Sequence, residues 1–173
     1  ATTLPYYEFR EVLTVRAADR DRFRSLADLK GRRVGTLAGT IAYEAVQAAG
    51  REHGVEPVSY DDDVHPYTDL ADGRLDAVVL DHVIAERSMR RTKGLVTQPA
   101  ALAVGHYVGV LAKGNGALRD EVNEVLRARM KDGTLERIYR TWGLWDEGQA
   151  AHFARVLTGA PADIRAVARG FGV

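Results

Sequence analysis

The sequence contains no cysteine among its 173 residues. Disulfide bonds are therefore excluded, and so is a metal site built from thiolates. No run of about 18 apolar residues, the length that a membrane-spanning helix needs, occurs anywhere in the chain. The 24 basic and 24 acidic residues cancel, so no global field attracts nucleic acid or an anionic membrane. A local site for a small charged ligand remains possible, because such a site needs no net charge.

Apolar periodicity predicts an α/β fold. Short runs with β-branched residues indicate strands at 12–17, 33–37, 57–60, 77–80 and 107–112. Helical spacing indicates helices at 41–53, 68–72 and 83–91, and two more within 117–142. This alternation is typical of a largely parallel sheet flanked by helices. Ligands of such sheets bind at the carboxyl ends of the strands.

One of these strand ends carries Gly39 and Thr40, which come between the strand at 33–37 and the helix at 41–53. A helix N-terminus presents unpaired N–H donors and the positive end of a dipole, so it suits a carboxylate or phosphate. Glycine allows an anion to approach the backbone, and the Thr40 hydroxyl can add a hydrogen bond. Alternatively, Thr40 only caps the helix and Gly39 only relieves a tight turn.

A second strand end carries Asp81, at the close of the run from Leu75 to Asp81. Its carboxylate could receive an ammonium group, or it could cap the helix at 83–91. An anion site and a carboxylate on neighbouring strand ends together would match a zwitterion, and an α-amino acid is the simplest such ligand.

Other polar and aromatic groups are interpreted as structural. The run Asp61 to Asp63 lacks the glycine and distal glutamate of a calcium loop and is expected to form a solvated turn. Trp142 and Trp145 are expected to anchor a core. The histidines have no metal-ligand spacing and are interpreted as surface or loop residues, with His82 alone near the proposed cleft. We therefore predict no catalytic residue, no metal and no cofactor. The histidines are His53, His65, His82, His106 and His152.

Several short motifs, in one order over most of the chain, resemble the amino-acid-type bacterial extracellular solute-binding proteins, often called family 3. They begin with Leu4-Pro5-Tyr6-Tyr7 and end near Trp142-Gly143. Between these lie SLADLKGRRVG at 25–35 with the following Gly39-Thr40, LADGRLDAVVLD at 70–81, and the segments 112–115, 118–123 and 132–143. The family binds amino acids and presents them to the permease of an ABC transporter in the periplasm or outside the cell.

The resemblance implies two α/β lobes that close on a ligand, of which this chain carries one periplasmic-binding-protein-like lobe and remnants of the other. It implies that the ligand carboxylate binds at the turn from Gly39 to Ala42, through Thr40 and the N–H of Ile41. Asp81 would bind the α-ammonium. Leu37 and Leu80 would form an apolar wall, and His82 could touch the ligand.

The same resemblance predicts the domain organisation. Residues 1–19 are expected to be a remnant of lobe one with the first hinge strand, and residues 20–105 the complete lobe two. Residues 106–145 would hold the return strand and C-terminal helices of lobe one, and residues 146–173 a helical tail or linker. The first ten residues lack the features of a signal peptide. We expect an N-terminally truncated chain, a piece of a longer protein.

The expected partners follow from this organisation. The helices within 117–142 would expose apolar stripes and could dock on a second copy. The segment from Trp142 to Gln149 resembles the ending of versions fused to a permease, which would tether the domain to a membrane. Two alternative functions stay open: a dehydratase-like enzyme on the same scaffold, and a ligand-sensing domain of a membrane receptor.

Overall fold

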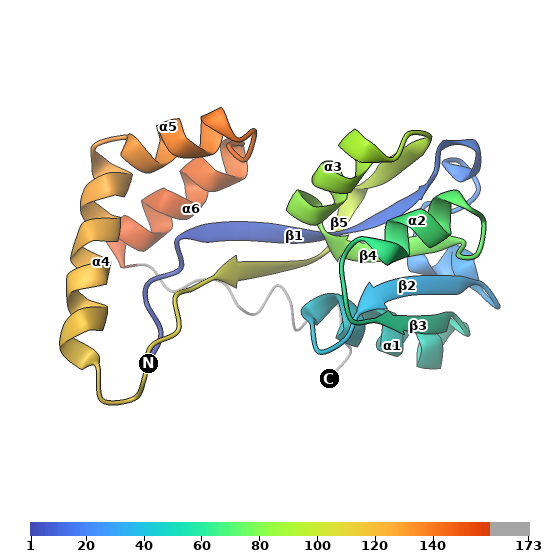
Figure 1. Ribbon diagram of the computed structural model, residues 1–173, viewed down its shortest axis with the longest axis horizontal. Helices are drawn as coiled ribbons and strands as arrows, with labels where there is room; N and C mark the ends of the chain where they lie inside the picture. Colours follow the sequence, from blue (N-terminus) through green and yellow to red (C-terminus); the bar gives the residue numbers. More distant parts are fainter. Residues whose placement is uncertain (160–173) are drawn as a thin grey trace. The chain divides into compact units, whose positions relative to one another are not determined.

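The computed structural model describes residues 1–159, which form two compact units. The sheet unit comprises residues 10–105, and the helical unit comprises residues 1–9 and 106–159 of this part. The chain passes between the units twice, within the strands β1 (Tyr7–Arg16) and β5 (Leu95–Tyr107) (Figure 1). The sheet unit starts at Arg10 rather than at residue 20, because residues 11–15 of β1 pair with another strand of its sheet.

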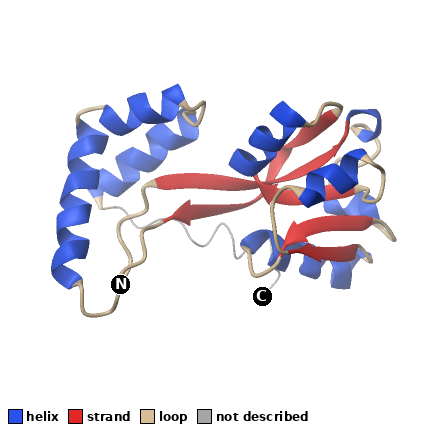
Figure 2. Ribbon diagram, viewed as in Figure 1, coloured by secondary structure: helices blue, strands red, loops and turns tan. Residues whose placement is uncertain are grey.

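The sheet has the strand order β3-β2-β4-β1-β5. The first three strands of this order are parallel: β2 (Arg33–Leu37) pairs in parallel with β3 (Glu56–Tyr60) and with β4 (Ala77–Asp81). Strand β1 pairs antiparallel with β4, with Glu11 opposite Asp81. The predicted α/β class is confirmed, and the sheet is mixed, with parallel pairs among β3, β2 and β4 and an antiparallel pair of β1 and β4. Figure 2 shows helices packed around these strands.

Helices cover both faces of the sheet. All five residues of β4 are buried, as expected for a central strand covered on each side. Helix α1 (Ile41–His53) packs on β2, β3 and β4, while α2 (His65–Ala71) and α3 (His82–Arg91) pack on β4. Two short 3-10 helices, Ala17–Asp19 and Leu26–Leu29, lie between β1 and β2. The resulting core includes Leu13, Val15, Val34, Val46, Tyr67, Leu70, Val78 and Leu80.

The helical unit contains α4 (Gly116–Lys131), α5 (Thr134–Thr141) and α6 (Glu147–Thr158). Aromatic rings form its interior: Tyr139 lies edge-on to Tyr7 at 5.2 Å and near Phe153 at 6.0 Å, and Trp145 packs on Phe153 at 5.2 Å. Helix α6 buries one face here, so residues 147–158 belong to this unit and do not form a separate tail. The expected helical pieces around Pro161 lie outside the described residues.

Most predicted elements match, and the fifth strand is the main error. The sequence indicated a strand at 107–112, whereas β5 covers Leu95–Tyr107. Strand β5 contains Pro99, and proline cannot donate to a ladder. Strand β5 is the last strand in the order, and within residues 1–159 it pairs on one side only, which makes proline acceptable.

The prediction for Trp142 is wrong, whereas the turn predicted at Asp61 to Asp63 is present. Trp142 is 68% exposed and is therefore no core anchor, unlike Trp145. The Asp61 to Asp63 run does form a turn: Asp62 accepts hydrogen bonds from the N–H groups of Val64 and His65. No helix among residues 1–159 has the length and apolarity needed to cross a bilayer.

Candidate functional site

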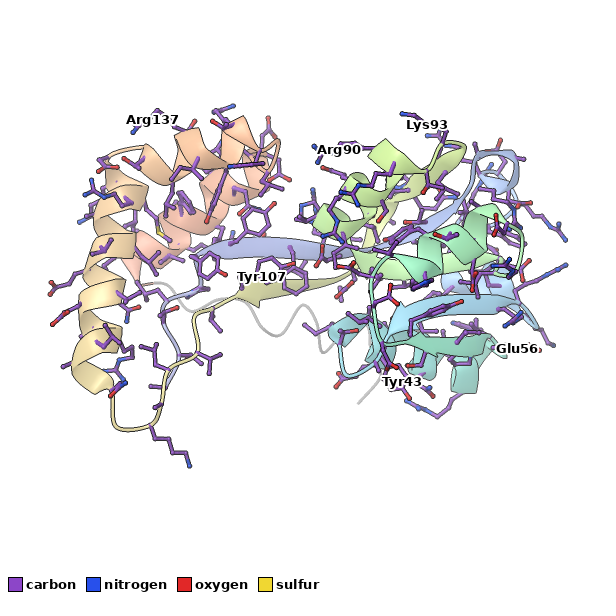
Figure 3. The ribbon with its side chains drawn as sticks, viewed as in Figure 1. Tyr43, Glu56, Arg90, Lys93, Tyr107 and Arg137 are labelled. Carbon is purple, nitrogen blue, oxygen red and sulfur yellow. The ribbon has the colours of Figure 1, made fainter. Side chains whose placement is uncertain are left out.

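The residues of the candidate site lie at the carboxyl ends of the parallel strands β2 and β4. Because β2 and β4 are parallel neighbours, the turn after β2 and the end of β4 lie at the same edge. That turn holds Gly39 and Thr40, and β4 ends at Asp81. The antiparallel register of β1 adds a third group, because it sets Glu11 opposite Asp81. Figure 3 labels Tyr43, in the first turn of α1 that follows this edge.

The turn before α1 is built by Gly39 and Thr40. Gly39 has a φ of 71°, a left-handed conformation that glycine adopts without strain. The Thr40 hydroxyl donates to the carbonyl of Leu37 at 2.7 Å and accepts from the N–H of Tyr43 at 3.1 Å. Thr40 is thus the N-cap, and its only hydroxyl proton is used within the turn. The N–H of Ile41, at the first helical position, has no acceptor within the helix and can face a ligand.

Glu11 is a site residue that the sequence analysis did not identify. Its side chain is buried, and its carboxylate accepts a hydrogen bond from the N–H of Ala42 in the first turn of α1. The other oxygen, Oε2, has no hydrogen-bond partner in the described part of the chain. Burial, followed by the charge of Asp81, raises the pKa of Glu11 to about 7. A carboxyl group of this chain therefore already lies against the α1 N-terminus and can be protonated near neutral pH.

Asp81 has the capping role that was one of the two interpretations left open by the sequence. It is buried at 7% exposure, and its carboxylate accepts from the N–H of Ile84 at 2.9 Å, which makes it the N-cap of α3. A carboxylate has two oxygens and about four acceptor sites, so it can take part in more than one contact. Its proximity also disfavours the ionised form of Glu11.

The remaining predicted site residues differ in how far their side chains are buried. Leu37 is half-buried, whereas Leu80 and Ala42 are fully buried in the core and reach this edge only through their backbones. His82 is buried, and its Nδ1 accepts from the backbone N–H of Arg10 at 3.2 Å, so the surface position expected for it is wrong. Of the two leucines, only Leu37 keeps exposed side-chain surface for an apolar wall.

This edge of the sheet brings a helix N-terminus and two carboxyl groups together. A free N–H at a helix N-terminus suits a carboxylate, and the paired carboxyl groups of Glu11 and Asp81 suit an ammonium. No local pattern could have revealed Glu11, because its place depends on the antiparallel pairing of β1 with β4. A glutamate before an apolar strand is more often solvated than buried.

Comparison with known proteins places the chain among binding proteins. The family described as bacterial extracellular solute-binding proteins, family 3, matches residues 1–144. The ABC transporter arginine-binding protein 1 of Escherichia coli K12 is 33% identical over 146 residues, which cover 81% of this chain and 58% of that protein. The L-cystine-binding protein TcyJ of the same strain is 32% identical over 129 residues, covering 74% of this chain and 48% of that protein.

Solved structures agree with these matches. An ancestral arginine-binding protein bound to arginine is 28% identical with a TM-score of 0.69, and the match covers 82% of this chain and 63% of that one. The chain spans about half the length of the curated relatives that it matches.

Proposed function

Because the chain belongs to the bacterial extracellular solute-binding proteins, family 3, we propose that its sheet unit binds an α-amino acid for an ABC transporter. Relatives named for arginine and cystine, and a similar structure that holds arginine, support an amino-acid ligand. The observation that carries the proposal is the strand-end edge, where the α1 N-terminus and the carboxylates of Glu11 and Asp81 come together.

We assign the ligand carboxylate to the turn from Gly39 to Ala42, with the N–H of Ile41 as a donor. The α-ammonium is assigned to Asp81, and Leu37 to the apolar wall. Relative to the expectation from sequence, Thr40 acts by shaping the turn, because its hydroxyl proton is bound to Leu37. Ala42 contributes its N–H to Glu11 and not to the ligand. Glu11 adds a second acidic group beside the ammonium, which favours ligands with excess positive charge.

The function proposed is binding without catalysis. Ligand contacts stabilise a closed form of the full two-lobed protein, and the permease recognises that form in the periplasm or outside the cell. The sheet unit supplies one side of the site, and the part of the family's length that this chain does not span would supply the other. This chain alone is therefore expected to bind its amino acid weakly.

A titration followed by nuclear magnetic resonance tests the proposal. We expect the amide signals of Gly39, Thr40 and Ile41 to shift when millimolar L-arginine, L-histidine or L-cystine is added to the ¹⁵N-labelled chain. The methyl ester of the bound amino acid lacks the carboxylate charge, and its N-acetyl derivative lacks the ammonium, so each should shift these signals much less. Equal responses to all three compounds, or no response to any amino acid, would contradict the proposal.

Apolar side chains on the helical unit support a further part of the proposal. Leu118 and Val125 lie seven residues apart on α4, Ile138 and Trp142 lie four apart on α5, and all four are exposed. We propose that these helices pack against protein, either a second copy or another part of a longer chain, including a version fused to a permease. Light scattering is expected to show concentration-dependent dimers that Trp142→Glu abolishes. A chain that stays monomeric at all concentrations would leave the longer chain as the partner.

A further inference from the structure

The helical unit contains a cluster of metal-binding groups that come from three distant parts of the sequence. Glu8 on β1, His106 on β5 and His152 on α6 each place one oxygen or nitrogen so that all these atoms lie within 4.8 Å of one another. Tyr107, next to His106, is labelled in Figure 3. Sequence spacing could not reveal this cluster, and the interpretation of His152 as a surface residue is wrong, because its side chain is fully buried.

Distances within the cluster suit a small divalent cation. The Oε2 atom of Glu8 lies 3.2 Å from Nε2 of His106 and 3.8 Å from Nδ1 of His152. Zinc bonds of about 2.0–2.2 Å in a tetrahedron separate neighbouring ligand atoms by about 3.3 Å. The two distances from Oε2 of Glu8 lie within about half an ångström of this separation, and all three ligand atoms lie within 4.8 Å of one another.

The hydrogen bonds of His152 prepare it as a ligand. Its Nε2 lies 3.0 Å from the carbonyl oxygen of Pro5, which can only accept, so Nε2 carries the proton. In the neutral ring, Nδ1 then directs a lone pair toward Glu8. Two acceptors consequently face each other, an arrangement that a cation between them would satisfy. A backbone carbonyl that orients a histidine through its other nitrogen is common around metal ligands.

A positively charged side chain already contacts the cluster. Arg155 on α6 pairs with Oε2 of Glu8 through its guanidinium group. The Arg155 side chain is 38% exposed, so it can turn toward solvent and release the oxygen. Imidazole ligands favour zinc and similar transition metals over magnesium or calcium.

We propose that Glu8, His106 and His152 bind one zinc ion, in competition with the guanidinium group of Arg155. A bound ion would join β1, β5 and α6 within the helical unit. Three protein ligands leave a fourth position for water. The proposal is independent of the amino-acid site, whose residues belong to the sheet unit.

Calorimetry with zinc chloride on the whole chain tests the site. We expect one zinc ion per chain and a rise in the thermal unfolding temperature of the wild type. His106→Ala should weaken binding by at least tenfold, because it removes a direct ligand. Arg155→Ala should strengthen binding about tenfold or more, because it removes the competing cation, an effect that a purely structural role of the cluster would not produce.

His65→Ala is the matched control, because His65 is exposed and pairs with Asp62 far along the sequence from the cluster. It should bind zinc as the wild type does. The proposal would be overturned by a wild type that binds no zinc at micromolar concentration, even if Arg155→Ala binds it. Equal loss in His65→Ala and His106→Ala would also overturn it, since binding would then be adventitious.

Discussion

Replacing Glu11 with glutamine is expected to stabilise the protein at pH 8 by up to about 3 kcal/mol and to leave its stability unchanged at pH 4. The side chain is 3% exposed, and burial and Asp81 raise its pKa from 4.5 to about 7. Since one pKa unit corresponds to about 1.4 kcal/mol, ionising Glu11 in the folded state costs on the order of 3 kcal/mol. Glutamine keeps an acceptor for the N–H of Ala42 and offers a donor where Oε2 is unpartnered.

The direction in which the stability changes with pH follows from proton linkage. Below pH 4.5 Glu11 is protonated in both the folded and the unfolded chain, so it contributes no penalty. As the pH rises from 4.5 to about 7, the unfolded chain releases this proton more readily than the folded one, and the free energy of unfolding falls. Above pH 7 the full penalty is present. The wild type should lose stability across this interval, and Glu11→Gln should lose less.

Urea unfolding of both proteins at a series of pH values measures the difference. Glu44→Gln is the matched control, because Glu44 lies on the exposed face of α1. It should follow the wild-type profile. Parallel profiles for the wild type and Glu11→Gln would mean that the Glu11 carboxyl is solvated in the folded protein, which would remove it from the site.

The second large effect is expected from Asp81→Asn, which should weaken binding of the amino acid about 30-fold. Losing a charge-assisted contact to an ammonium costs on the order of 2 kcal/mol. Asparagine is as good an N-cap as aspartate, so the bond from the N–H of Ile84 and the helix α3 should persist. Titration with L-arginine or the tightest-binding amino acid of the panel, followed by amide shifts, measures the affinity.

The same variant has a second readout. Because the charge of Asp81 contributes to the raised pKa of Glu11, the pKa of Glu11 should move down toward 4.5 in Asp81→Asn. Circular dichroism should show unchanged helix content. Unchanged affinity together with a lowered pKa of Glu11 would place Asp81 in the site but disprove its role toward the ammonium.

Helix ends and buried strands were predicted correctly, because they depend on residues that are close in the sequence. Helix α1 begins and ends as expected, because Thr40 caps one end and Gly54, with a φ of 73°, terminates the other. The parallel strands were recognisable as apolar runs that both faces of the sheet bury. The caps at Thr40 and Asp81 were foreseen as alternatives, and the structure shows that both exist.

The features that the sequence did not reveal depend on pairing between distant parts of the chain. Glu11 reaches the ligand edge only because β1 runs antiparallel to β4. Glu8 and His152 are 144 positions apart and meet only when α6 packs on β1. The strand β5 was misplaced for a related reason, since its place beside β1 depends on pairing between distant parts of the chain.

Strand β5 also has a consequence for the behaviour of the protein at high concentration. A thirteen-residue strand with one unpaired side offers a template on which another chain could add its own strand and start a fibril. Pro99 lies within β5 beside Ala100 and Ala101, and all three are exposed. Because proline has no N–H, an incoming strand meets a gap in the row of donors at this point. Pro99 thereby interrupts the edge on which another chain could add a strand.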